Sequence, residues 1–347
     1  KALEQSSITY KFRSFKMKKQ LLIAAVAATM TSVAFADISL TGSMKVNYTN
    51  KDTVGAASTN TVTQEGDLVL TGTNGGTKVH VEVSIDGGNS TGTANSSSAN
   101  NMRTEDVWLS TNIGSVAVKT GTWNLTDTIF NDNATRTTGN WVLSTDVSGV
   151  NIAVEGDSNV SAVKTTLSGD IAGVSAKYVM KGTASATSTG KATAGKATNE
   201  LYLGTNVAGF DVTYAMIDSD ATTSDAAAFT IAKEFNGVTI SYSDVDADAS
   251  YKVTGDTAAF GNAAGFMNIG DDAKAIKLAT SVAGNTVSAR FVSVDALVAA
   301  NDVDVNTFTV TRPLAGGTTL EVTYTDTDES GTTVDNEVLD VELAVKF

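Results

Sequence analysis

The chain ends on the stretch LDVELAVKF, residues 339–347, in which apolar and polar side chains take alternate positions. Successive side chains of a β-strand point to opposite faces, so this period of two predicts a strand with one apolar and one polar face. The same period runs through ISLTGSMKVNY, residues 38–48, and KVHVEVSI, residues 78–85. The polar face carries Ser, Thr, Asn, Lys and Glu side chains. We therefore expect an all-β chain whose strands each face two different environments.

Short turns that end in glycine separate the predicted strands. Glycine supplies the positive φ that tight hairpins require. From Gly76 to Gly317 the turns recur about every 34 residues, which is enough for two strands and a longer connection. The glycines that close these turns are Gly76, Gly114, Gly149, Gly173, Gly209, Gly237, Gly284 and Gly317.

Longer polar segments join the other ends of the strands, at residues 86–104, 183–198, 246–272 and 326–335. Short turns at one end and long loops at the other are typical of a transmembrane β-barrel, whose short turns face the periplasm. Eight turns join 16 strands, and one further strand at each end gives 18. A count of 16 stays open, because one weak hairpin around residues 138–170 decides it. We predict a closed antiparallel barrel of 16–18 strands, 18 by the hairpin count.

The N-terminal segment predicts export from the cytoplasm. Residues 17–36 combine a basic start, an apolar run and the ending AFA, which together indicate a cleavable signal peptide. The apolar run is too short for a membrane-spanning helix, which needs about 20 residues. Residues 1–16 are interpreted as an over-extended reading frame, and residues 37–347 as a single barrel domain. Residues 1–36 contain six basic side chains and one acidic, so without them the net charge falls from −14 to −19.

Composition excludes several classes of function. The chain has no Cys and a single His, His80, so thiolate metal sites, His-based metal cages and most His-dependent catalysis are not expected. The negative net charge argues against nucleic-acid binding, which needs clustered Lys and Arg. No catalytic group stands out, and we expect neither an enzyme nor a cofactor. His80 lies between Lys78 and Glu82 on the polar face of its strand and is expected to line a lumen.

Acidic segments and aromatic residues leave alternatives open. The segments around Asp244, Asp271 and Asp326 offer oxygen ligands for weak divalent-cation binding, but their spacing lacks an EF-hand pattern and solvated loops are favoured. Tyr residues on the apolar phase predict an aromatic girdle at the membrane interface, and the three Trp residues are interpreted as interface anchors or packing residues rather than a carbohydrate slide. These aromatic residues are Tyr178, Tyr214, Tyr242, Tyr324, Trp108, Trp123 and Trp141.

A central stretch carries a family resemblance. RTEDVWLSTNIGSVAVKTG, residues 103–121, resembles the fourth and fifth strands of general bacterial porins, and the signal peptide, the opening strand and the terminal Phe347 agree with that family. The resemblance implies a homotrimer of water-filled channels in the outer membrane. Lipid and lipopolysaccharide would then surround the barrel, and small hydrophilic solutes would pass through it.

The resemblance also implies a pore constriction. In that family the loop after the fifth strand folds into the lumen, which here assigns Asp127, Asp132 and Arg136 of the segment 123–136 to the constriction. Opposed charges across a narrow lumen create a transverse field that discriminates ions. The chain departs from the family at Thr122, where an Arg is usual. The basic wall facing this loop would consist of inward-phase lysines, namely Lys45, Lys78 and Lys119.

Two classes of function remain after these arguments. The first is passive diffusion of small hydrophilic solutes and ions, with cation preference expected from the net charge of −19. The alternative is a secreted surface, S-layer or adhesin-like β protein without channel activity. A β-solenoid would show a shorter repeat than the spacing of about 34 residues found here. An enzyme inside a barrel is the third and least supported interpretation.

Overall fold

The computed structural model describes residues 37–91, 101–125, 135–157, 163–182, 198–219, 225–247, 271–296, 302–330 and 336–347. The predicted signal peptide and the extension before it lie outside these residues. Within them, no helix is long and apolar enough to cross a membrane. The described chain is built from strands, with one short 3₁₀ turn, η3 (Ala315–Gly317), before the penultimate strand.

The strands follow one another along the whole described chain. They are β1 (Asp37–Thr53), β2 (Thr59–Asn74), β3 (Thr77–Thr91), β4 (Asn101–Ile113), β5 (Val116–Leu125), β6 (Thr135–Val147), β7 (Val150–Gly156), β8 (Lys164–Ile171), β9 (Val174–Lys181), β10 (Thr198–Val207), β11 (Phe210–Ser219), β12 (Ala226–Phe235), β13 (Val238–Ala247), β14 (Asp272–Val282), β15 (Asn285–Asp295), β16 (Val303–Pro313), β17 (Thr318–Glu329) and β18 (Asn336–Lys346).

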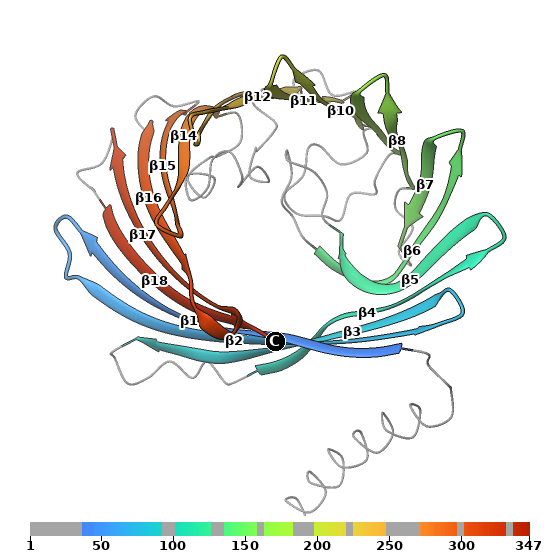
Figure 1. The fold of residues 1–347 in the computed structure, drawn as a ribbon, viewed down its shortest axis with the longest axis horizontal. Helices are drawn as coiled ribbons and strands as arrows, with labels where there is room; N and C mark the ends of the chain where they lie inside the picture. Colours follow the sequence, from blue (N-terminus) through green and yellow to red (C-terminus); the bar gives the residue numbers. More distant parts are fainter. Residues whose placement is uncertain are drawn as a thin grey trace, which may run out of the picture.

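Each strand pairs antiparallel with the strands before and after it in the chain, and β1 pairs with β18 (Figure 1). The result is a closed ring of 18 strands, so the hairpin count of 18 is confirmed. The weak hairpin around residues 138–170 contributes to the ring as β6, β7 and β8, although β7 has 7 residues and β8 has 8. Every described strand therefore has a hydrogen-bonded partner on both sides.

The first and last strands close the ring by an extended ladder. It runs from the pair Ser43 and Lys346 to the pair Thr53 and Asn336. Beyond it, Gly42 N donates to Phe347 O at 2.8 Å, and Phe347 N donates to Gly42 O at 3.0 Å. The ring of Phe347 lies over Gly42, where a Cβ would come within 2.6 Å of a ring carbon. The terminal aromatic residue thus needs a glycine beneath it.

The predicted glycine turns are present at all eight positions. Their closing glycines have φ between 64° and 90°, the left-handed region that favours glycine. In five turns the residue before the closing glycine has positive φ without being a glycine itself, which is the type I′ pattern that matches strand twist. These residues are Ser148, Ala172, Ala208, Asn236 and Ala283.

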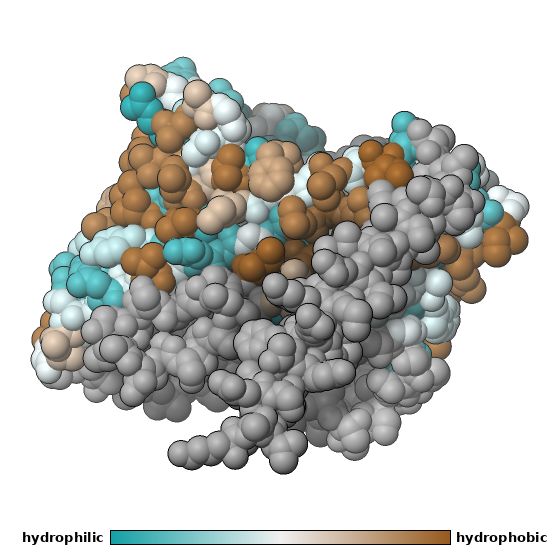
Figure 2. Space-filling model, turned by 90° about the horizontal axis from the view of Figure 1, so that it is seen from below, coloured by the Kyte–Doolittle hydropathy of each residue, from teal (hydrophilic) through white to brown (hydrophobic). Residues whose placement is uncertain are grey.

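The outer wall of the barrel is apolar. Figure 2 shows hydrophobic side chains gathered in a band across the uncovered part of one outer face. Tyr178 and Tyr214, two of the predicted girdle residues, lie on this phase with about a third of their surface exposed. Phe291 and Phe308 lie on the same phase of neighbouring strands and pack edge to face, with ring centroids 5.9 Å apart. Large apolar side chains without a protein partner are what a lipid-facing surface requires.

One part of the inner wall differs from the sequence expectation of a polar face. On β11 to β16, at the ends away from the short turns, the inward phase carries Ala, Val and Ile instead of Ser, Thr or charged residues. All of these side chains are at most 7% exposed, so this part of the wall does not face open water. The cluster consists of Ala215, Ile217, Ala226, Ala228, Val245, Ala247, Ala273, Ala275, Val292, Val294, Val303 and Val305.

The turn between β8 and β9 gives a test of the requirement for glycine at the closing position of the short turns. Gly173 has φ of 84°, and a Cβ there would meet no atom within 4 Å. We expect Gly173→Ala to lower the free energy of unfolding by about 1–2 kcal/mol through left-handed strain alone. The measurement is the urea midpoint of the refolded barrel. Ala172→Gly is the matched control, and it should not lower stability, because Ala172 already has φ of 54°. An unchanged midpoint for Gly173→Ala would contradict the assignment of strain.

Candidate lumen site

The candidate site is the inner wall of the barrel, formed by the side chains on the phase opposite to the exposed apolar ones. Each strand contributes every second residue to it. Of the expected basic wall, Lys78 and Lys119 lie close together on β3 and β5, because both contact the ring of Trp108 on β4. Lys78 Nζ is 5.4 Å and Lys119 Nζ is 4.4 Å from the centroid of that ring.

Lys45 does not belong to this group, which corrects the expectation of a single basic wall. Its Nζ lies 2.6 Å from Glu65 Oε2 on β2. Glu65 is opposite Asp86 on β3, and Asp86 is eight residues along that strand from Lys78, or about 26 Å at a strand rise of about 3.3 Å per residue. The period of two assigns a residue to a face, but it does not place two lysines at the same level of the wall.

Lys119 lies between two indole rings. Its Nζ is 4.4 Å from the Trp108 centroid and 4.3 Å from that of Trp123, which is buried. Gly121 makes this packing possible, because a Cβ there would lie 2.2 Å from Val107 O and 2.6 Å from Trp108 Cα. Trp108 and Trp123 are therefore lumen residues and not interface anchors. Trp141 is on the outer phase, two residues before the exposed Leu143.

The predicted constriction loop is only partly within the described residues. Asp127 and Asp132 lie outside them. Arg136 belongs to β6, where its backbone pairs with Asn124, so it is a strand residue rather than a loop residue. The strands β5 and β6 extend further than expected, and the connection between them covers residues 126–134.

Carboxylates gather on the inner wall around the seam of the barrel. Glu321 and Glu342 are directly opposite one another on β17 and β18. Glu321 accepts a hydrogen bond from Thr311 Oγ1 at 2.9 Å, and Asp67 accepts one from Ser43 Oγ at 3.3 Å. We call this region the acidic arc; its described strands also carry Lys45, Lys51 and Lys346 on the inward phase. Its carboxylates are Glu65, Asp67, Glu321, Asp340 and Glu342.

Three lysines lie on the opposite side of the ring. In a ring of 18 strands, β9 is diametrically across from β18, as Figure 1 shows for its neighbours β8 and β10. The region contains Lys164 on β8 with Lys177 and Lys181 on β9, and we call it the basic arc. Lys164 forms an ion pair with Glu155 of β7, and Lys181 Nζ lies 3.1 Å from Glu200 Oε1 of β10. Three ammonium groups thus accompany two carboxylates here, whereas three ammonium groups accompany five carboxylates in the acidic arc.

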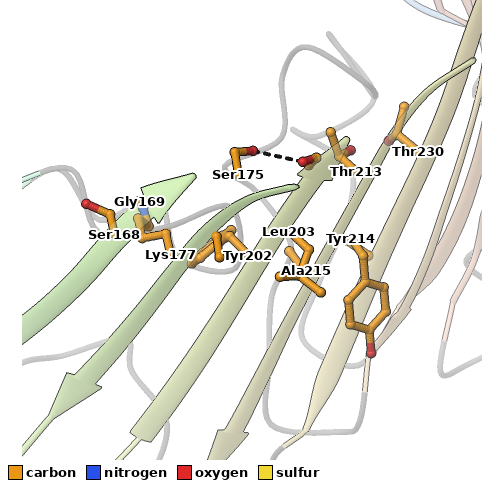
Figure 3. Close-up of a pocket in the computed structure, with 13 residues that line it drawn as sticks. Ser168, Gly169, Ser175, Lys177, Tyr202, Leu203, Thr213, Tyr214, Ala215 and Thr230 are labelled. Atoms are coloured by element: carbon orange, nitrogen blue, oxygen red, sulfur yellow. Dashed lines mark hydrogen bonds between the residues drawn. The ribbon is translucent and has the colours of Figure 1, made fainter. Parts of the chain in front are cut away.

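A shallow recess of about 450 Å³ adjoins the basic arc (Figure 3). Gly204 leaves room for it, and Ser175 Oγ donates to Gly204 O at 3.0 Å. Lys177 Nζ lies 4.3 Å from the centroid of the Tyr202 ring, which keeps the ammonium near the wall. Hydroxyl groups supply the rest of the polar lining, from Ser168, Ser175, Thr213 and Thr230. The recess therefore combines a mainly apolar lining with hydroxyl groups and one positive charge.

The sequence alone did not predict the basic arc, nor the buried Glu200 that pairs with Lys181 of that arc. The side chain of Glu200 is fully buried between Lys181 and the hydroxyl of Tyr202, which donates to Glu200 Oε2 at 3.0 Å. Period-two phasing puts Lys177 and Lys181 on one face of β9 and Glu200 on the inward face of β10. That signal identifies the face, but the pairing of residues needs the strand register.

Comparisons with known proteins agree with this geometry. A family model described as Gram-negative porin matches residues 23–332. No curated protein sequence matches the chain. The chain resembles the solved structure of Pseudomonas aeruginosa OpdL, with a TM-score of 0.65 at 11% identity over 90% of this chain and 99% of that one.

Two further solved structures share the fold. Acinetobacter baumannii OccAB4 has a TM-score of 0.64 at 11% identity, over 90% of this chain and 99% of that one. Wzi is described as an Escherichia coli outer-membrane protein involved in group 1 capsule assembly and a carbohydrate-binding β-barrel. It has a TM-score of 0.57 at 8% identity, over 88% of this chain and 84% of that one. Identities this low establish likeness of fold alone.

The pair of Lys181 and Glu200 gives a stability test. We expect Glu200→Ala to lower the free energy of unfolding by more than the surface-pair limit of about 1 kcal/mol and by at most about 3–5 kcal/mol. The reason is that Lys181, 19% exposed, would lose this carboxylate inside the wall. Glu65→Ala is the control, because the side chains of Lys45 and Glu65 are 45% and 38% exposed and their pair should contribute less than about 1 kcal/mol. Equal losses in urea unfolding would contradict the prediction.

Proposed function

Because the chain belongs to the family of Gram-negative porins, we propose that it is an outer-membrane channel for passive diffusion of small hydrophilic solutes and ions. The observation that carries this proposal is the opposition of charges across the closed ring. The acidic arc on β17, β18, β1 and β2 faces the basic arc on β8 and β9. Such an arrangement imposes a transverse field on the lumen, and a field of this kind orders polar solutes as they pass.

Cation preference is part of the proposal. The acidic arc has an excess of carboxylates over ammonium groups, whereas the lysines of the basic arc are largely compensated by Glu155 and Glu200. A cation passing the wall near the seam therefore meets negative charge in excess, and the charge of −19 expected for residues 37–347 has the same sign. Electrostatic attraction of this kind raises the local concentration of counter-ions.

Single-channel recording tests the proposal. The protein refolded into a planar bilayer should give stable conductance steps, and a KCl gradient should give a reversal potential of the sign expected for cation preference. The double variant Glu321→Gln and Glu342→Gln should lower the ratio of K⁺ to Cl⁻ permeability about twofold or more, since a unit charge contributes about 1 kcal/mol at 4 Å in water. The glutamines keep their hydrogen-bonding oxygens, so the fold should persist.

A matched control lies on the same strand. Asp328 of β17 is exposed on the outer phase, and Asp328→Asn should leave the permeability ratio unchanged. A folded, inserted protein without conductance would refute the channel and favour the surface or adhesin-like alternative. Conductance with anion preference would refute the cation preference alone.

The proposal includes a homotrimer surrounded by lipid and lipopolysaccharide. Family membership supports the trimer, and conductance steps that occur in groups of three would agree with it. Carboxylates on the outer phase of β13 to β18, at the ends away from the short turns, support loose divalent bridging to lipopolysaccharide phosphates. Three pairs of them lie directly opposite one another on neighbouring strands, and like charges in that position are destabilising unless a cation lies between them. The pairs are Asp272 with Asp295, Asp304 with Asp328, and Asp326 with Glu337.

Calcium titration tests the outer carboxylates. With a dissociation constant near 1 mM, typical of weak extracellular sites, 10 mM Ca²⁺ should stabilise the folded barrel by about 1.4 kcal/mol. The measurement is thermal unfolding with and without Ca²⁺. The double variant Asp304→Asn and Asp328→Asn should reduce the shift, whereas Asp340→Asn on the inner wall should keep it. If Ca²⁺ does not change the unfolding temperature of the unmodified protein, this part of the proposal is wrong.

A further inference from the structure

Three side chains with metal-binding atoms converge on the inner wall of β3 and β4. They are His80, Glu82 and Asp106, and one ligand atom of each lies within 4.8 Å of the others. His80 Nε2 is 3.7 Å from Glu82 Oε2. All three residues are partly buried and open towards the lumen. No other group of three or more such residues with this spacing occurs in the described parts of the chain.

A β-bulge lies beside this group. Val81 is opposite Val107 and Val83 is opposite Thr104, so two residues of β4 face the single residue Glu82. Asp106 is two residues from Trp108, which is opposite His80, so ordinary alternation places both side chains on the same face of β4, and the extra residue shifts the alternation only on the far side of Asp106. Bulges often re-aim a side chain at a functional position. Without the extra residue, the position across from Glu82 would hold one side chain instead of two.

The imidazole is held in place by its neighbours. The rings of His80 and Trp108 are stacked, with centroids 4.7 Å apart and an interplanar angle of 8°. Lys78 and Lys119 lie over the same indole ring, and the charge of Lys119 acts on Asp106. Two carboxylates and one imidazole therefore face two ammonium groups, and a bound cation would compete with Lys119 for Asp106.

We propose that His80, Glu82 and Asp106 bind one divalent transition-metal cation of the Zn²⁺ type on the lumen wall. Imidazole with carboxylates suits Zn²⁺ and Ni²⁺, whereas Ca²⁺ and Mg²⁺ take oxygen ligands alone. Metal–ligand distances of about 2.0–2.2 Å place tetrahedral ligands about 3.3 Å apart. Side-chain rotation of up to about 1.5 Å would bring the three atoms to that distance. The remaining coordination position faces the lumen, where water or a passing solute can occupy it.

The site does not depend on channel activity, and the composition of the chain makes it testable. His80 is the only histidine in the sequence, so any binding that needs an imidazole must involve it. Trp108 lies in contact with that imidazole and can report on a quenching metal such as Ni²⁺. The experiment uses the full chain, refolded in detergent and purified without a histidine tag.

Zn²⁺ titration calorimetry gives the affinity, and quenching of tryptophan fluorescence by Ni²⁺ gives the location. We expect saturable Zn²⁺ binding, and Ni²⁺ quenching that Zn²⁺ reverses and Ca²⁺ does not. His80→Gln should raise the Zn²⁺ dissociation constant at least about tenfold, because loss of even a second-shell partner costs about 10–100-fold. Trp108→Phe should keep Zn²⁺ binding and lose most of the quenching. Asp340→Asn, a lumen carboxylate near the seam, should change neither.

Two results would overturn the site. One is the absence of saturable Zn²⁺ binding below about 1 mM, since the outer carboxylates alone can account for weaker association. The other is a His80→Gln variant that keeps both the affinity and the quenching. Should that variant fail to fold, Glu82→Gln keeps the imidazole and its stacking, and it should weaken Zn²⁺ binding by a similar factor. Unchanged affinity in folded Glu82→Gln would likewise overturn the proposal.

Discussion

A barrel in lipid depends on one constraint: every backbone N–H and C=O in the membrane must find a partner within the protein. In the described strands this condition is met by pairing each strand on both sides, and the ring is completed where β18 meets β1. The ladder at that seam extends to the last residue, whose backbone exchanges hydrogen bonds with Gly42 on both of its polar groups. The aromatic ring of Phe347 covers Gly42 on the outer side. Closure therefore rests on a glycine and a phenylalanine that are far apart in the sequence.

Closure also fixes the chemistry of the wall, because a wall one strand thick has no hydrophobic core of its own. Alternate residues of each strand must suit lipid on one side and the lumen on the other. The lumen side has no uniform character. It carries excess carboxylate at the seam, compensated lysines across the ring, indole and imidazole rings on β3 to β5, and an apolar cluster on β11 to β16. Different sectors of the same lumen thus offer a passing solute different surfaces.

The sequence predicted the strands, the eight turns and the number 18, because period-two alternation and turn glycines are local properties that need no knowledge of the partner strand. It assigned His80, Lys78 and Lys119 to the inner face for the same reason. It could not show that Lys45 lies apart from the other two lysines, since the level of a residue on the wall depends on the register between strands. The proximity of Lys181 to Glu200, and of Asp106 to His80, depends on the register between strands, which is not visible in the periodicity. The apolar inner cluster was not predicted, because the sequence analysis expected the inner face of every strand to be polar.

The seam has a further consequence for the order of the chain. The two ends of the barrel sequence lie on adjacent strands and are held together by hydrogen bonds alone. In architectural terms the ring has no first strand: a covalent link between Phe347 and Asp37 would complete a ninth connection at the end where the eight short turns lie. Opening any one of those turns would then yield a circular permutant that keeps all 18 strand pairings.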